Sequence, residues 1–346
     1  MSSKNFSLLV LPIVLISCNS CKNPPKKLNL FNWKYYIGDS TVEKFEKEYN
    51  VVVNISYYSS NEECLASLKS SKGNYDIVIP SDYMVGLMIK ENLLSEIDRS
   101  KIDNFKNIDT FFIGSKKGFD PDDKFSVPYM FGTTGFARNR TKIRTSIKSW
   151  DDFLAVGDSE KYTLLDDVRF VYGSLLMNYG YDPNTLNEAE LKRVTDTLLK
   201  HKKNLKVFTH DTPKEMLING EANLSYAWSG DVLQSSFENP DVVYELPEKG
   251  TLMFQDGICI PKEAPHPDVA LLFINFLLRP EISAGITNTI KYGNTNREAR
   301  ALIDKNIRDN PVVFPSGDYL LNCKRIKDLG EKISIYEKYW NLLKEN

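Results

Sequence analysis

Residues 251–261 read TLMFQDGICIP, an apolar run that carries one acid, Asp256, near its middle. Three apolar residues precede Gln255-Asp256-Gly257 and three follow, which is typical of a buried strand. A carboxylate inside such a strand is costly unless something pairs with it. The partner could be a structural arginine, a backbone turn or a ligand. Other parts of the sequence are needed to distinguish these three possibilities.

The bulk composition is that of an ordinary globular protein. The chain has 346 residues, enough for two lobes with separate cores at roughly 100–200 residues per domain. Apolar residues make up 42% and charged residues 26%, with a net charge of −2 and no long run of one sign. A nucleic-acid partner is therefore not expected. The 18 Tyr and 4 Trp can serve as recognition surfaces as well as core.

The N-terminus reads MSSKNFSLLVLPIVLISCNSCKN and has the pattern of an export signal. Lys4 gives it a charged start, and the apolar stretch 6–16 follows. This stretch is shorter than the ~20 residues that span a membrane as a helix. It is therefore interpreted as the core of a signal peptide rather than as an anchor helix.

The cut region Leu15-Ile16-Ser17-Cys18 resembles the bacterial lipobox. We expect residues 1–17 to be a lipoprotein signal peptide, Cys18 to be the lipidated first residue of the mature chain, and 18–27 to be a flexible tether. The alternative is a plain secretory cut with Cys18 and Cys21 as a CxxC redox pair. Such a pair normally opens a helix after a strand, whereas Asn, Lys and Pro-Pro follow here.

The remaining cysteines, Cys21, Cys64, Cys259 and Cys323, show no disulfide framework and no zinc-ligand spacing. Export permits disulfides, but we predict none that is required, no metal site and no cofactor. Cys259 is expected to be a small buried apolar residue.

Strands and helices alternate after the tether. Strands are expected at 28–33, 51–59 and 75–81, with helices at 39–50, 61–71 and from 82 to about 92. This βαβαβ pattern predicts an α/β fold with a parallel sheet and covering helices. The expected caps are Asp39 or Ser40 for the first helix and Asn61 for the second.

A second α/β block begins near Gly135. Its strands are expected at 162–167, 224–229 and 242–247, and its helices through Tyr179, at 187–203, at 266–280 and at the C-terminus. Residues 129–139 and the stretch around Gln255 are interpreted as crossings between two lobes. Lobes joined in this way form a cleft, and ligands of open α/β sheets bind at the carboxyl ends of the strands.

The expected strand ends carry aromatic and acidic residues together: Trp33 with Tyr35 and Tyr36, Ser81 with Asp82 and Tyr83, Asp166 with Asp167, and Trp228 with Asp231. Aromatic faces attract cations, at about 0.5–2 kcal/mol each, and carboxylates bind ammonium groups. The combination suits an elongated polyamine, for which Asp256 would be a counter-ion. The alternatives are ordinary packing for the aromatic residues and helix capping for Asp231 and for Asp167 or Asp166.

Seven motifs carry a resemblance to a known family: FNWKYY, YDIVIPSDY, LLDDVR, YAWSGDV, FQDGICIPK, LLFINFLLRPE and the stretch from Tyr292 to Asn296. In this order and spacing they resemble the spermidine/putrescine-binding proteins of bacterial ABC importers. The resemblance covers roughly residues 28–346. It implies a two-lobed periplasmic-binding-protein fold of type II with a ligand cleft between the lobes. The first lobe would comprise 28–134 and 256–301, and the second 135–255 and 302–346.

The resemblance also implies ten ligand-binding positions. Six are aromatic, one is a serine and three are acids: Trp33, Tyr36, Tyr83, Trp228, Phe254, Tyr292, Ser81, Asp167, Asp231 and Asp256. Asp256 matches the principal amine-binding aspartate of the family. Asp231 matches an acid of its putrescine-preferring branch.

Three departures bear on the choice of polyamine. Phe170 stands where the spermidine branch has a glutamate, and Ile326 falls near its late glutamine. Lys34 lies where the family often has an acid, and it would repel a polyamine unless it points away or pairs with Asp82. Because fewer acids hold fewer amines, the prediction leans toward putrescine while keeping spermidine.

The implied function is that of a monomeric, lipid-anchored periplasmic receptor. It would capture polyamines and deliver them to membrane permease subunits driven by a separate ATPase. The chain itself has no GxxxxGK[ST] motif. The alternatives are a surface sensor or host-interaction lipoprotein on the same fold and, less favoured, an exported hydrolase with a carboxylate pair. No HExxH or GxSxG motif is present, so an enzyme is not predicted.

Overall fold

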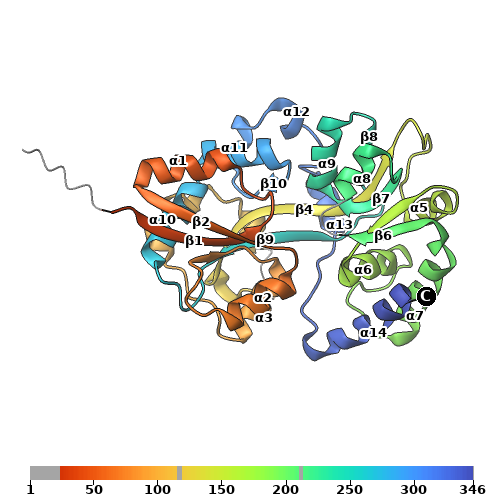
Figure 1. The fold of residues 1–346 in the computed structure, drawn as a ribbon, viewed down its shortest axis with the longest axis horizontal. Helices are drawn as coiled ribbons and strands as arrows, with labels where there is room; N and C mark the ends of the chain where they lie inside the picture. The colour runs from red at the N-terminus through yellow and green to blue at the C-terminus, as the bar shows by residue number, and fades with distance from the viewer. Residues whose placement is uncertain (1–23, 115–118, 210–212, 346) are drawn as a thin grey trace, which may run out of the picture.

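The computed structural model describes residues 24–114, 119–209 and 213–345. They form two α/β lobes that lie side by side, with the strands of both lobes joined in one sheet (Figure 1). The predicted signal peptide, Cys18 and most of the predicted tether lie outside the described residues.

The left-hand lobe in Figure 1 contains the predicted βαβαβ unit. Its parallel strands have the order β2-β1-β3, and β9 runs antiparallel beside β3. The elements of this unit are β1 (Lys26–Trp33), α1 (Asp39–Tyr49), β2 (Val51–Tyr58), α2 (Asn61–Ser70), β3 (Ile77–Val78), α3 (Asp82–Lys90) and, later in the chain, β9 (Met253–Cys259).

Two strand bounds differ from the prediction. β1 begins at Lys26, which pairs with Val51, so the strand includes the last two residues of the predicted tether. β3 keeps only Ile77–Val78 of the predicted strand 75–81. Pro80 follows closely and has no N–H to donate to a neighbouring strand.

The right-hand lobe is built on the second half of the sheet, in which β7 lies between β4 and β5, and β6 forms the edge. β5 is parallel to β6 and β7, whereas β4 is antiparallel to β7 and β8. These strands are β4 (Ser126–Asn139), β5 (Tyr162–Leu165), β6 (Leu205–Thr209), β7 (Leu224–Trp228) and β8 (Val242–Glu245).

β4 and β9 connect the two halves of the sheet. The first part of β4 pairs with β9, and its last residues pair with β7 and β8. A further connection is the segment 323–329, here called the strap, which lies between α13 (Gly317–Asn322) and α14 (Ile333–Glu345). Figure 1 shows the strap running down between the lobes to α14. The predicted crossings at 129–139 and around Gln255 therefore lie on β4 and β9.

The remaining helices cover the sheet and the ends of the lobes. They are α4 (Thr110–Gly114), α5 (Trp150–Gly157), α6 (Val168–Asn178), α7 (Glu188–Lys200), α8 (Pro213–Asn219), α9 (Ser229–Glu238), α10 (Pro267–Leu277), α11 (Pro280–Ile290) and α12 (Lys305–Arg308), and the short strand β10 (Gly293–Asn294) pairs with β4. α10 begins at Pro267 and ends before Pro280, as predicted. No single described helix is long and apolar enough to cross a membrane; α10 and α11 reach that length only as a pair bent by 77°.

Two of the predicted helix caps are wrong. Gly38 is the N-cap of α1 and makes no side-chain bond, so neither Asp39 nor Ser40 has this role. α2 is capped by Ser60, whose hydroxyl accepts a hydrogen bond from the Glu63 N–H. Asn61 is thereby left to bond elsewhere. Cys64, Cys259 and Cys323 are buried and unbridged, and Cys259 is the buried apolar residue that was expected.

We predict that Gly250→Ala destabilises the protein by more than about 1 kcal/mol. Gly250 has a φ of 96°, and an added Cβ would lie 2.5 Å from the Asn322 carbonyl oxygen. Gly317→Ala is the matched control, because its Cβ would meet nothing within 4 Å and alanine favours the helix. Urea unfolding of both variants measures the difference. Equal stability of the two would contradict the strain at Gly250.

Candidate functional site

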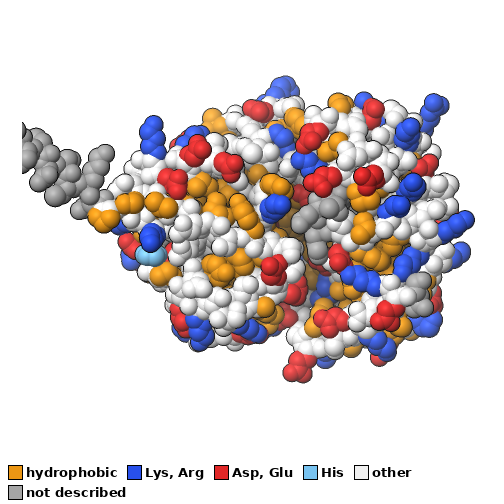
Figure 2. Space-filling view, in the orientation of Figure 1, with side chains coloured by type: hydrophobic (Ala, Val, Ile, Leu, Met, Phe, Trp, Pro, Cys, Tyr) orange, Lys and Arg blue, Asp and Glu red, His pale blue; other side chains and the backbone are white. Residues whose placement is uncertain are grey.

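A cleft of about 750 Å³ lies between the lobes, where several strands end. Figure 2 shows the molecule hollowed between the two lobes, with acidic side chains on both sides of the hollow. All ten residues predicted to bind a ligand line this cleft: Trp33, Tyr36, Ser81, Tyr83, Asp167, Trp228, Asp231, Phe254, Asp256 and Tyr292. The fold thus brings together residues that are up to 259 positions apart (292 − 33) in the sequence.

Asp256 is held by two neutral hydroxyl groups. It lies on β9 and is only 3% exposed. The Tyr36 hydroxyl donates to Oδ2 at 2.5 Å, and the Ser81 hydroxyl donates to Oδ1 at 2.8 Å. Both donors orient the carboxylate, but neither neutralises its charge.

The electrostatic state of Asp256 follows from this environment. Burial raises its pKa to about 7, and the negative charge of the neighbouring Asp82 acts in the same direction. The hydrogen bonds from Tyr36 and Ser81 lower the pKa and only partly offset the burial. A cation entering the cleft would favour the ionised carboxylate.

Five aromatic rings form a continuous wall along the cleft. Tyr36 contacts Tyr292 edge-to-face at 5.4 Å between centroids, and Tyr292 contacts Phe254 at 5.9 Å. Phe254 contacts Trp228 at 5.1 Å, and Trp228 contacts Phe170 at 4.6 Å. These edge-to-face contacts fix the ring orientations. The wall can cover the methylene chain of a ligand and attract its cationic groups.

Asp231 is a second acid on this wall. It lies in the first turn of α9, which begins at Ser229, so the alternative that Asp231 caps this helix is wrong. The Tyr292 hydroxyl donates to Asp231 Oδ1 at 2.8 Å. Gly230 permits this arrangement, because a Cβ at that position would lie 2.3 Å from the Tyr292 ring. Tyr36 and Tyr292, which are neighbours in the wall, thus each bind one carboxylate.

Asp167 caps α6 and also lines the cleft. Its Oδ1 accepts hydrogen bonds from the N–H groups of Arg169 and Phe170, at 2.9 and 3.1 Å. Asp166 instead forms an ion pair with Lys344. The choice between the two acids, which the sequence leaves open, is therefore settled in favour of Asp167.

The other predicted site residues lie on the first-lobe side. The Trp33 indole donates to the Ile79 carbonyl oxygen at 2.9 Å and packs against Tyr58. The Tyr83 hydroxyl donates to Glu62 at 3.2 Å. Glu62 was missed by the sequence analysis, although it follows the end of an expected strand, where functional residues gather.

The cleft contains more acids than the motif positions suggest. Among the residues that the structure describes, two basic residues, Lys34 and Arg169, line the cleft, together with nine carboxylates: Glu62, Glu91, Asp166, Asp167, Asp231, Asp256, Asp328, Glu331 and Glu337. Asp328 and Glu331 come from the strap and the turn after it, and Glu337 comes from α14. Three of these acids, Glu91, Asp166 and Asp328, form ion pairs with lysines. The remaining six still favour a cationic ligand.

The predicted alternative of a Lys34–Asp82 pair is wrong. Asp82 pairs with Arg325 at 2.5 Å, and both side chains are largely buried. The Lys34 ammonium lies over the exposed Tyr35 ring, 4.8 Å from its centroid.

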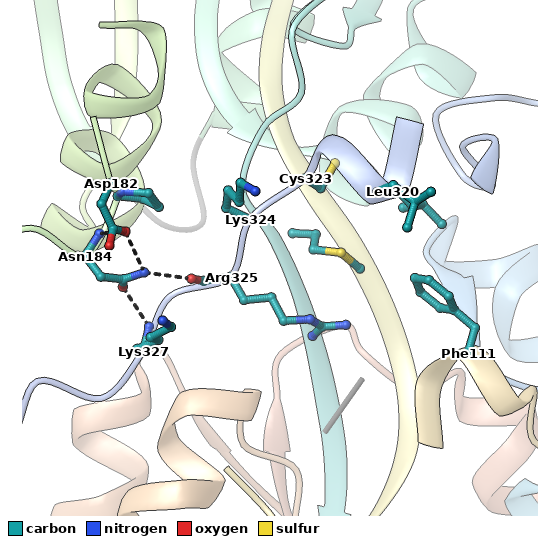
Figure 3. Close-up of a pocket in the computed structure, with 11 residues that line it drawn as sticks. Phe111, Asp182, Asn184, Leu320, Cys323, Lys324, Arg325 and Lys327 are labelled. Atoms are coloured by element: carbon teal, nitrogen blue, oxygen red, sulfur yellow. Dashed lines mark hydrogen bonds between the residues drawn. The ribbon is translucent and has the colours of Figure 1, made fainter. Parts of the chain in front are cut away.

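A smaller pocket of about 330 Å³ lies at the strap (Figure 3). Phe111, Leu320 and Leu321 give it an apolar side, and the strap contributes Lys324, Arg325 and Lys327. Three cations and one acid, Asp182, make it unsuitable for an amine. In the described part of the chain, no group of three or more His, Cys, Asp or Glu residues could hold a metal ion.

Comparisons with known proteins agree with this architecture. The family model described as "Bacterial extracellular solute-binding protein" matches residues 40–315. A spermidine/putrescine-binding periplasmic protein of Escherichia coli is 34% identical over 319 residues, which cover 92% of this chain and 91% of the relative. A putrescine-binding periplasmic protein of Pseudomonas aeruginosa, SpuD, is 32% identical over 89% of this chain and 88% of the relative.

Solved structures show the same fold. The spermidine/putrescine ABC transporter substrate-binding protein PotD of Streptococcus pneumoniae has a TM-score of 0.82 and 29% identity. The Tp0655 (TpPotD) lipoprotein of Treponema pallidum has a TM-score of 0.83 and 30% identity. Each comparison covers 92% of this chain and 99% of the other. The expected two-lobed fold of type II is confirmed, and the chain belongs to the family of bacterial extracellular solute-binding proteins.

Proposed function

We propose that this protein captures polyamines, putrescine or spermidine, and delivers them to the membrane permease of an ABC importer driven by a separate ATPase. The observation that carries the proposal is Asp256, a buried carboxylate in the cleft whose two bound partners are neutral hydroxyls. A ligand ammonium would supply the missing positive charge. Relatives that bind spermidine and putrescine support this assignment.

The chemistry of the cleft fits an elongated diamine or triamine. A hydrogen bond between an ammonium group and a carboxylate contributes about 1.5–3 kcal/mol. Asp256 and Asp231 are two such carboxylates beside one aromatic wall. Each accepts a hydrogen bond from a tyrosine hydroxyl of that wall. The wall would cover the methylene groups between the amines. All ten predicted positions are assigned to ligand binding on this basis.

The structure weakens the reason for preferring putrescine. That preference rested on the few acids at the motif positions. Glu62, Glu331 and Glu337 add carboxylates to the same cleft from α2 and from the C-terminal region. We therefore assign both the diamine and the triamine to the site.

Delivery would depend on closure of the lobes. We assign residues 28–134 and 256–301 to the first lobe, and 135–255 and 302–346 to the second. A ligand that binds Asp256 on one side and Trp228 or Asp231 on the other favours the closed arrangement by its higher affinity for it. The permease would recognise that closed form of a monomer.

The proposal includes anchoring to the membrane through a lipid on Cys18. The lipobox-like stretch 15–18 and the polar, proline-containing tether after it support this anchoring. One structural relative is itself described as a lipoprotein. The protein would then stay in the periplasm beside its permease.

Thermal unfolding of the mature domain with candidate ligands tests the function. Putrescine, cadaverine, spermidine and spermine are compared with amino acids. A ligand at about 100 times its Kd should add about 2.7 kcal/mol to the free energy of unfolding. A shift of the unfolding temperature by an amino acid, with none by any polyamine, would reject the proposal.

We predict that Asp256→Asn abolishes polyamine binding and stabilises the ligand-free protein at about pH 8. The raised pKa means that the folded state holds this proton more tightly than the unfolded state, whose carboxyl has the ordinary value of 3.8. The resulting stabilisation is present below about pH 4 and is lost as the pH rises through about 7. At pH 8 the ionised Asp256 is therefore destabilising, and the neutral amide should add roughly 1 kcal/mol or more.

Calorimetric titration and thermal unfolding check both effects. Asp268→Asn is the control, since Asp268 is an exposed acid outside the cleft. Normal polyamine affinity of the Asp256→Asn protein would show that the amine site is assigned wrongly.

Polyamine affinity should also fall with decreasing pH. In the free protein Asp256 takes up a proton below about pH 7, and an ammonium ligand has to displace that proton. The affinity should drop by up to about tenfold per pH unit below this point and level off above it. Titration in buffers with different ionisation enthalpies would detect the released proton. A constant affinity from about pH 5 to 8 is the contrary result.

A further inference from the structure

Arg325 of the strap contacts the sequence neighbours of both residues that meet in the amine site. Its Nη1 forms an ion pair with Asp82, which directly follows Ser81. Its Nη2 donates to the Gln255 side-chain oxygen at 3.4 Å, and Gln255 directly precedes Asp256. Ser81 and Asp256 are themselves joined by a hydrogen bond and by a β-bridge. One guanidinium group therefore holds the two segments that meet at the amine site.

The backbone of the strap is fixed to the beginning of β9 and to the second lobe. Lys324 exchanges backbone hydrogen bonds with Thr251 and Met253. The Asn184 amide donates to the Arg325 carbonyl oxygen at 3.1 Å and accepts from the Lys327 N–H at 2.8 Å. In Figure 3 these bonds lie on the left, and the Arg325 side chain extends away from them.

Arg169 extends this connection to the wall of the cleft. It donates to the Lys327 carbonyl oxygen at 3.1 Å and to the Asn184 side-chain oxygen at 2.8 Å. Arg169 lies in the first turn of α6, between Asp167 and Phe170, which both line the cleft. A continuous set of bonded groups therefore joins Asp256 in the first lobe to the N-terminal end of α6, which lines the cleft from the second lobe.

The ion pair is not explained by stability alone. Two charges that are mostly removed from water lose hydration, and apolar residues of similar volume are often as stabilising as such a pair. What a buried pair can supply is one defined geometry. The Arg325 guanidinium group suits this role because its two terminal nitrogens bind Asp82 and Gln255 at the same time.

We propose that Arg325 is a positioning residue for the amine site, which couples the placement of Ser81 and Asp256 to the strap and so to lobe closure. The inference rests on the proposed polyamine function. Arg325 does not line the cleft, so it acts through Asp82 and Gln255 and not through contact with the ligand. A ligand that draws Asp256 and the N-terminal end of α6 together acts on both ends of the bonded groups that run through Arg325 and the strap.

The test is a double variant, Asp82→Asn with Arg325→Met, which removes the pair without leaving a buried charge. We expect it to fold and to bind putrescine and spermidine at least about tenfold more weakly, within the usual range of coupling between sites. X-ray scattering at saturating ligand should show a smaller compaction than in the wild type. A purely structural role would lower the unfolding temperature and leave ligand-induced compaction unchanged.

The matched control removes an ion pair of similar burial in the second lobe. Arg138 and Glu245 pair at 2.9 Å, are 11% and 18% exposed, and do not line the cleft. Arg138→Met with Glu245→Gln should leave polyamine affinity within about threefold of the wild type. An equal loss in the control, or affinity within about threefold in the Asp82/Arg325 variant, overturns the inference. Absence of polyamine binding by the wild type would instead reject the proposed function.

If the double variant does not fold, a second variant tests the coupling between the amine site and the strap. Asn184→Ala removes the two hydrogen bonds between the Asn184 side chain and the strap without changing any charge. Weaker polyamine binding with reduced compaction supports the coupling. Wild-type affinity and compaction in this variant overturn it.

Discussion

The cleft is organised around a buried carboxylate that has no positive partner among the residues that the structure describes. Asp256 is oriented by Tyr36 and Ser81, and its charge still lacks compensation within its hydrogen-bond shell. A buried charge of this kind is normally neutralised by a proton or by a cation. Because its pKa lies near neutrality, the side chain can accept either. The remainder of the cleft makes a cationic ligand the better choice.

Asp256 lies at the junction of the two lobes. β9 carries Asp256 between β3 and β4, at the place where the sheet passes from one lobe to the other. The strap adds a connection that depends on side chains as well as backbone, through Arg325 and Asn184. The proposed amine site therefore lies beside the strands and the strap that connect the lobes.

The alternation of strands and helices, and most of the positions that line the cleft, were predictable because both leave local patterns, whereas Phe254 and Tyr292 were assigned to the cleft only by the family resemblance. The acid within TLMFQDGICIP and the aromatic residues at strand ends are such patterns. The Asp82–Arg325 pair joins residues 243 positions apart and has no local signature. The cap of α2 was assigned to Asn61 rather than Ser60, because adjacent capping residues cannot be ranked without the backbone angles. Glu331 and Glu337 reach the cleft only through the path of the strap.

The aromatic wall has a practical consequence. Three of the four tryptophans, Trp33, Trp228 and Trp340, line the cleft, and Trp150 is buried in the core. Indole emission depends on hydration and on nearby charge. Trp228 packs between Phe170 and Phe254 and lines the cleft, so a ligand in the cleft would change its surroundings. The protein thus carries an intrinsic fluorescent reporter of occupancy, with no label to be attached.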